Sequence, residues 1–198
     1  RWNPLFDFDY LFQRDVTTNT GTMHGLRGRV SSPVKSPWLL GFEAFVDVGK
    51  VDGRSVRRGG FTFSGGVLFE SGPEARPLSE EERAEREHIG AFHRRQNFHE
   101  FAIGFELGLA EMKGFLENDD RTYGAIRAGF TTSIGLYGFN VKGSVHGEVY
   151  TDRTLYDSNI LVGFGQPWWP IGVAFGYRNL TVKSYHGSFL IAALEYRF

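Results

Sequence analysis

Apolar and polar residues alternate along most of the chain, which is the pattern of β-strands with one apolar face. One uninterrupted run places Phe101, Ile103, Phe105, Leu107 and Leu109 on one side and small or polar residues between them. Similar runs begin near Phe6, Leu26, Leu40, Phe61, Ile126, Phe139, Ile160, Ile171 and Leu190. The pattern predicts an all-β, antiparallel protein of about ten strands, with eight or twelve as alternative counts, and residues 1–198 as a single domain.

The apolar faces of these runs carry no charged residue, although 23% of the chain is charged. An arginine on a lipid-facing surface near the middle of a bilayer costs roughly 2–4 kcal/mol, whereas a charge in a watery lumen costs little. A soluble β-sandwich or small soluble barrel would instead bury its apolar faces and expose its charges. The segregation therefore favours a transmembrane β-barrel.

Aromatic residues gather at the ends of the predicted strands, as expected for the two interfacial belts of a membrane barrel. An even number of strands brings both chain ends to the same side of the barrel. The strand ends on that side carry Trp2, Trp38, Trp168 and Trp169, and the opposite ends carry Tyr123, Tyr150, Tyr156 and Tyr185. We therefore expect a tryptophan belt on one side and a tyrosine belt on the other.

Composition narrows the possible functions. The 26 glycines and 16% aromatics suit many strands joined by tight turns. The absence of cysteine excludes a disulfide framework, a thiolate metal site and a cysteine nucleophile. A net charge of −1 gives no electrostatic reason to expect a nucleic-acid partner. No spacing predicts a metal site, and no cofactor is expected.

The final residues include Tyr196 and Phe198, separated by one position. With the strand pattern, this pair resembles the aromatic–x–aromatic signal of bacterial outer-membrane β-barrels. The resemblance implies an integral outer-membrane location with both termini in the periplasm. It also implies that the barrel-assembly machinery recognises the signal, and that outer-membrane lipid and lipopolysaccharide surround the barrel.

Residues 71–97 form the longest connection and the densest charge run, on the side assigned to the periplasm. Ser79 followed by Glu82 makes a capping-box pattern, so a short helix is expected from about Glu80 to Ile89. One interpretation is a solvated helical excursion. The alternatives are a plug across the barrel mouth or a docking arm for a periplasmic or membrane partner, with Leu78, Ile89 and Phe92 as apolar contacts.

The polar faces of the predicted strands carry acids and bases in nearly equal number. They are Asp7, Asp9, Arg27, Arg29, Glu43, Asp47, Glu106, Arg127, Lys142, Glu148, Arg178, Glu195 and Arg197. Asp7 and Asp9 on the first strand can face Arg27 and Arg29 on the second. A ten-stranded barrel is narrow, so these side chains predict a salt-bridged lumen that keeps the barrel closed. The alternative is a narrow ion-conducting or substrate-binding lumen.

His186 and Ser188 fall on one strand face near the chain end. They resemble the histidine–x–serine pair of outer-membrane lipid A deacylases, in which the serine attacks an acyl ester. Glu195 has the opposite parity and lies too far along the strand to orient this histidine, so Asp152 or Asp157 is the candidate third member. The competing interpretation is an ordinary loop histidine and serine.

These patterns favour a structural or interaction component of the cell envelope over a catalyst. The barrel would anchor the chain, while its loops and the 71–97 arm present surfaces to partners. The first alternative is a narrow, porin-like channel or transporter for small or hydrophobic solutes. The second is a lipid A-modifying hydrolase that uses His186 and Ser188.

Overall fold

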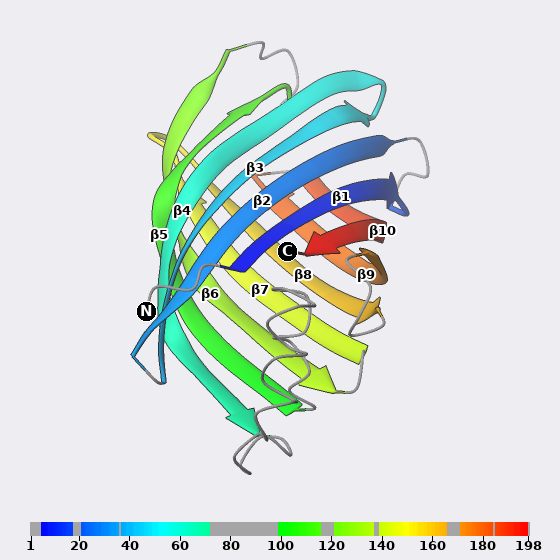
Figure 1. Cartoon of the computed structure of the whole chain (residues 1–198). Coiled ribbons are helices and arrows are strands. Elements are labelled where there is room, and N and C mark those ends of the chain that lie inside the picture. Colours follow the sequence, from blue (N-terminus) through cyan, green and yellow to red (C-terminus); the bar gives the residue numbers. More distant parts are fainter. Residues whose placement is uncertain are drawn as a thin grey trace, which may run out of the picture.

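Ten antiparallel β-strands close into a barrel in the computed structural model (Figure 1). The structure describes residues 5–17, 21–35, 37–71, 99–115, 121–136, 139–165, 171–183 and 185–197. The strands are β1 (Leu5–Asp15), β2 (Thr22–Lys35), β3 (Trp38–Val51), β4 (Arg54–Ser71), β5 (His99–Lys113), β6 (Tyr123–Leu136), β7 (Phe139–Val149), β8 (Thr154–Phe164), β9 (Ile171–Val182) and β10 (Tyr185–Arg197). The predicted all-β, antiparallel fold and the strand number are confirmed, while the helix expected from about Glu80 to Ile89 lies outside the described residues.

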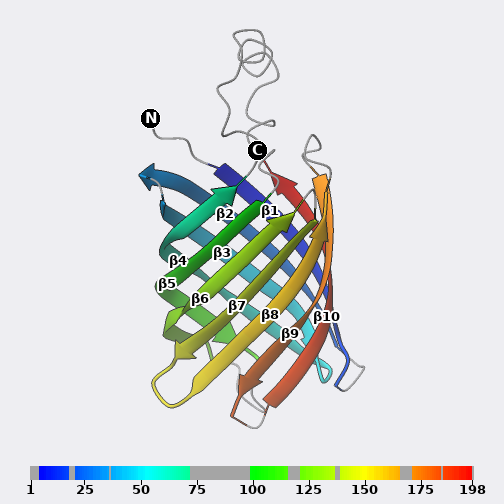
Figure 2. The ribbon, with the colours of Figure 1, turned by 90° about the horizontal axis from the view of Figure 1, so that it is seen from below.

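Each strand pairs with its neighbours in sequence, and β1 pairs with β10 to close the sheet. At this seam Asp7 lies opposite Arg197 and Tyr10 lies opposite Leu194. The start of β1 and the end of β10 therefore lie at one end of the barrel, where Figure 2 labels both termini. We call this the terminal end and the opposite one the loop end. Within the described ranges, no helix is long and apolar enough to cross a membrane.

The strands run further toward the loop end than the hydrophobic pattern predicts. The alternation alone predicts a connection from Lys50 to Arg58, but β3 continues to Val51 and β4 begins at Arg54. Asp52 and Gly53 alone make the turn, both with positive φ (49° and 75°), the backbone form that tight two-residue hairpin loops require. Similarly, the alternation predicts a connection from Thr151 to Ser158, but β8 already begins at Thr154.

The physical reason is that β-pairing continues where lipid contact ends. Beyond the bilayer boundary a strand no longer needs an apolar outer face, so the alternation fades while the backbone ladder persists. β4 has 18 residues, whereas about 9–11 tilted residues suffice to cross the hydrocarbon. The extra length places residues assigned to loops inside the barrel.

Apolar side chains cover the outside of the barrel along every strand. Exposed examples, with fractional exposures between 51 and 62%, include Phe63, Leu107, Phe130, Val145, Ile160, Phe175 and Leu190. The buried charged residues of the described ranges point inward instead: Asp15, Glu43, Asp47, Arg58, Glu106, Arg127, Glu148, Asp157, Arg178 and Glu195. The faces assigned from the sequence pattern are the faces that the structure shows.

The interior is not uniformly polar, because an apolar cluster fills its loop end. The buried members are Met23, Val51, Val56, Met112, Phe115, Ala125, Tyr150, Leu155, Leu180, Val182 and Phe189, with Tyr123 and Tyr185 packed against them. A smaller cluster lies deeper, between β1, β8, β9 and β10: Leu11, Leu161, Ala174, Ile191 and Ala193. Charged and apolar layers thus alternate along the inside.

One exposed aromatic residue at each end agrees with the predicted belts, but three of the four tyrosines do not. Trp38 at the terminal end is 61% exposed, as the belt requires, while Trp2, Trp168 and Trp169 lie outside the described residues. At the loop end Tyr156 is 60% exposed. The tyrosine belt is otherwise wrong: Tyr123, Tyr150 and Tyr185 join the interior apolar cluster, because their strands extend past the interface and turn them inward.

Candidate functional site

A fully buried ion network lies beneath the apolar cluster of the loop end. At one side, Arg178 donates from Nε to Asp157 Oδ1 at 2.9 Å, from Nη2 to Asp47 Oδ2 at 2.9 Å and from Nη1 to Gln13 Oε1 at 2.8 Å. The Arg178 side chain has no exposed surface. Its planar fork therefore holds together four elements of the wall: β1, β3, β8 and β9.

Arg58 bridges the other side of this network. Its Nε donates to both carboxylate oxygens of Glu148 at 3.1 Å, and its Nη2 lies 2.9 Å from Asp157 Oδ2. Arg127 Nη1 donates to Glu148 Oε1 at 2.6 Å, and the Tyr150 hydroxyl donates to Glu148 Oε2 at 2.7 Å. Glu148 thereby receives hydrogen bonds from three side chains.

The network balances three guanidinium groups against the carboxylates of Asp47, Glu148 and Asp157. The Phe45 ring lies against two of the cations, with its centroid 5.0 Å from Arg58 Cζ and 4.7 Å from Arg127 Cζ. Buried charges persist only where they are paired and hydrogen-bonded, which this arrangement provides. It spans the lumen, from β4 to β7 through Arg58 and Glu148 and from β3 to β9 through Asp47 and Arg178.

A second charged group lies nearer the terminal end. Arg29 Nη2 contacts Glu43 Oε2 at 2.5 Å and Glu106 Oε1 at 3.6 Å, and His146 Nε2 lies 2.8 Å from Glu106 Oε2. The Arg29 side chain is 35% exposed. This group is therefore more exposed to solvent than the ion network nearer the loop end.

Lys142 makes a separate pair in the same region. Its Nζ lies 2.7 Å from Glu195 Oε1 and 4.0 Å from Asp9 Oδ2, and its side chain is 23% exposed. The register also sets Asp7 opposite Arg29 and Asp9 opposite Arg27, as predicted from the sequence. The terminal end of the lumen is thus a partly solvated vestibule.

Sequence reasoning missed two central members of the buried network, Arg58 and Asp157, because it assigned both to outer loops. The alternation of faces could have indicated that both residues point inward, because Arg58 lies on the same strand face as the buried Thr62 and Asp157 on the same face as the buried Leu161. Of the predicted lumen residues, Arg197 is described only by its backbone pairing with Asp7. Tyr196 points outward and is 41% exposed. The predicted residues Leu78, Ile89, Phe92 and Phe198 lie outside the described residues.

His186 and Ser188 lie on the outer face of β10 but bond to different residues. His186 Nδ1 is 3.4 Å from Thr181 Oγ1, while the Ser188 hydroxyl donates to Asn179 Oδ1 at 2.8 Å. The serine proton therefore points toward an amide oxygen and not toward the histidine. A nucleophile activated by its histidine requires the opposite arrangement.

The candidate acids for that pair are also engaged elsewhere. The expectation that Asp157 reaches His186 is wrong, because Asp157 points into the barrel and binds Arg178 and Arg58. Asp152 is exposed and bonded to Arg153, and its carboxylate lies 3.5 Å from Lys183 Nζ. The hydrogen bond from Arg153 lowers the pKa of Asp152 to about 2.

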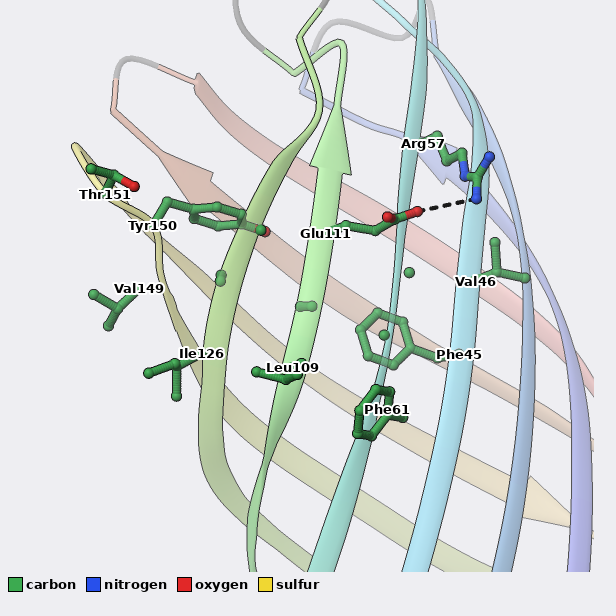
Figure 3. Close-up of a pocket in the computed structure, with 15 residues that line it drawn as sticks. Phe45, Val46, Arg57, Phe61, Leu109, Glu111, Ile126, Val149, Tyr150 and Thr151 are labelled. Carbon is green, nitrogen blue, oxygen red and sulfur yellow. Dashed lines mark hydrogen bonds and ion pairs between the residues drawn. The ribbon is translucent and has the colours of Figure 1, made fainter.

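The outer wall carries a groove of about 890 Å³ near the loop end, between β3 and β7 (Figure 3). Its apolar side is formed by Phe61, Leu109, Ile126 and Val149, which lie next to one another in register. Its other side carries Arg57 and Glu111, whose Nη2 and Oε1 atoms lie 3.1 Å apart. The groove combines hydrocarbon walls with an exposed ion pair.

An apolar outer surface around a charged interior is the inverse of a soluble barrel. Soluble monomers rarely expose contiguous apolar patches above a few hundred Å², whereas here every strand contributes exposed large hydrophobics. Fold and surface together define the class of protein: the chain is a closed, ten-stranded transmembrane β-barrel.

Comparison with known proteins gives structures but no family. No protein-family model matches the chain, and no curated protein matches it. Among solved structures it is similar to Neisserial surface protein A, at 12% identity and a TM-score of 0.37, covering 98% of this chain and 96% of that one. It is also similar to the KdgM porin, at 10% identity and a TM-score of 0.36, covering 97% and 99%.

A third similar structure is the outer membrane protein opdK from Pseudomonas aeruginosa, at 7% identity and a TM-score of 0.31, covering 98% of each chain. The architecture described above rests on the strand pairing of this chain itself.

Proposed function

We propose that this protein is an integral outer-membrane barrel that acts as a closed structural or interaction component of the cell envelope. The observation that carries the proposal is the filled interior. An apolar cluster closes the loop end, and a charge-balanced network lies directly beneath it. Both are removed from water, since Arg58, Arg178, Leu155 and Leu180 have no exposed surface.

A conducting pore needs a continuous polar path through the lumen. The apolar cluster and the ion network each interrupt such a path, for different reasons. An apolar constriction excludes water and ions because nothing there replaces their hydration. The network offers charges that are already paired within the protein, since Asp47, Glu148 and Asp157 each contact a guanidinium group. Passage through the lumen would require displacing both layers together.

The same proposal gives roles to the ends of the barrel. The termini would face the periplasm, and lipopolysaccharide and other outer-membrane lipid would surround the wall. The barrel-assembly machinery would engage Tyr196 and Phe198 during insertion. Residues 71–97 would reach a periplasmic or membrane partner through Leu78, Ile89 and Phe92.

Planar-bilayer recording tests the closed state. We expect no reproducible unitary conductance from the purified barrel, with a known porin as the positive control in the same bilayer. A steady open channel of defined conductance would overturn the closed-barrel proposal in favour of the transport alternative.

Purification from native membranes tests the interaction role. We expect a protein to co-elute with the intact chain and to be lost when residues 78–94 are deleted. If the deletion variant retained that protein, residues 71–97 would not be the binding site for the partner.

A further inference from the structure

The lateral groove between β3 and β7 is built from three adjacent rows of outward-facing residues. The first row, Phe61–Leu109–Ile126–Val149, is apolar, and its members are 38–61% exposed. The second row sets Gly59 opposite Glu111 and Glu111 opposite Gly124. The third row sets Arg57 opposite Lys113. From the membrane toward the loop end, the wall thus changes from an apolar row, through a row of two glycines on either side of Glu111, to a cationic row.

The glycines create the depression. A Cβ at Gly124 would meet no heavy atom within 4 Å, so the space in front of this residue is open. The groove measures about 890 Å³, within the range of about 300–1,000 Å³ that is usual for small-molecule sites. In Figure 3 Leu109, Ile126 and Phe61 lie at its lower side and the Arg57–Glu111 pair at its upper side.

The cations above the groove are incompletely neutralised. Arg57 and Lys113 lie directly opposite each other, and like charges in that position repel. Lys50, opposite Ser55 on the neighbouring strand pair, adds a third exposed cation. Glu111 supplies one carboxylate, and Arg57 remains 65% exposed in the pair. A phosphate would relieve the remaining repulsion, and a guanidinium fork suits phosphate geometry.

We propose that this groove binds a phosphorylated lipid, with one acyl chain along the row from Phe61 to Val149 and a phosphate held by Arg57 and Lys113. The inference rests on the proposed outer-membrane orientation, in which the loop end lies in the outer leaflet. The lipid there is lipopolysaccharide, so we assign the groove to its lipid A moiety. Cations at the interface hold the headgroup while the glycines admit the chain.

The test measures lipid retained by the full chain in phosphatidylcholine nanodiscs doped with bisphosphorylated lipid A, by native mass spectrometry. We expect Gly124→Leu, which fills the groove, to lower lipid A retention by about tenfold. The matched control is Gly28→Leu, a β2 position where an added Cβ also meets nothing within 4 Å. This control should retain lipid A as the unmodified protein does.

A second comparison tests the cations. Lipid A retention is measured for the double variant Arg57→Gln/Lys113→Gln and for the control Arg14→Gln/Lys183→Gln, which removes two exposed loop-end cations outside the groove. Only the first pair should weaken retention, and only of phosphorylated lipid A. Equal retention of the dephosphorylated lipid by the unmodified protein would overturn the phosphate contact. Equal retention of phosphatidylglycerol would overturn the lipid A assignment.

Two further outcomes separate this proposal from the preceding one. Unchanged retention by Gly124→Leu, with a folded barrel shown by heat-modifiable gel mobility, would overturn the groove while leaving the closed lumen intact. Binding of a co-purified protein across the groove, lost in the same variant, would also overturn the lipid assignment. Channel conductance, by contrast, would overturn the closed lumen alone.

Discussion

Arg58 and Glu148 lie 90 residues apart in sequence, yet the Nε of one donates to both carboxylate oxygens of the other. They come from β4 and β7, which are not neighbours in the sheet. The contact therefore crosses the lumen instead of following the wall. Since neither side chain is exposed, each depends on the other to compensate for lost hydration.

Replacing Arg58 by methionine should destabilise the barrel strongly. The change leaves Glu148 with only Arg127 and Tyr150 and removes one contact of Asp157. Breaking one partner of a buried ion pair costs about 3–5 kcal/mol. Urea unfolding in lipid vesicles, followed by tryptophan fluorescence, measures the loss. Arg57→Met, at an exposed neighbouring position, is the control and should change stability by less than about 1 kcal/mol.

The double variant Arg58→Met/Glu148→Met should recover much of this loss. It removes one positive and one negative charge, so no uncompensated ion stays behind. A double-mutant cycle gives the coupling between the two sites. Additive effects of the single changes would contradict the assigned contact.

Leu180→Ala should destabilise the fold far more than Leu190→Ala. Leu180 is fully buried in the apolar cluster of the loop end, while Leu190 is 54% exposed on the outer wall. A buried leucine-to-alanine change leaves a cavity and costs about 2–5 kcal/mol. At the outer wall, lipid can fill the space. Equal unfolding free energies for the two variants would contradict a packed lumen.

Leu107→Arg should block membrane assembly. Leu107 is 52% exposed on β5, and an arginine on the lipid face near mid-bilayer costs roughly 2–4 kcal/mol. Ser144→Arg is the matched control, because Ser144 points inward and accepts a hydrogen bond from Asn159. Heat-modifiable gel mobility after refolding into vesicles compares them. Better assembly of Leu107→Arg than of Ser144→Arg would indicate the opposite orientation of the wall.

Acid should release the contact between Asp152 and Arg153. The hydrogen bond from Arg153 lowers the pKa of Asp152 from 3.8 to about 2. A group whose pKa is lower in the folded state stabilises that state above its unfolded pKa, and the effect disappears as pH falls through the folded value. The contact should thus persist above pH 4, be half lost at about pH 2 and disappear below that pH. Carboxyl NMR titration in micelles measures the midpoint, and a midpoint near 3.8 would contradict the contact.

The wall of the barrel could be predicted from sequence because lipid imposes a rule on it. Positions such as Phe105, Phe130 and Val145 must be apolar, and their spacing of two residues gives strand and face together. The rule weakens where strands leave the bilayer. Arg58 and Asp157 then look like loop residues, although pairing continues around them.

Local contacts of the sheet set a second limit on prediction. Gly108 looks like a lumen position that could accept a long side chain. However, a Cβ there would lie 1.9 Å from the carbonyl oxygen of Phe61, so the position admits only glycine without a backbone shift. The groove is equally hidden in the sequence, because Gly59, Glu111 and Gly124 come together only through the register of three strands.

The hydrogen bond from Arg178 to Gln13 joins β9 to β1. Between these strands lies β10, whose pairing with β1 is where the two ends of the chain meet to close the sheet. The side-chain hydrogen bond spans that junction on the lumen side and links the two strands that flank β10. A bond that spans the seam in this way opposes the separation of β1 from β10, so the ends of the sheet are held together by side chains as well as by the backbone ladder.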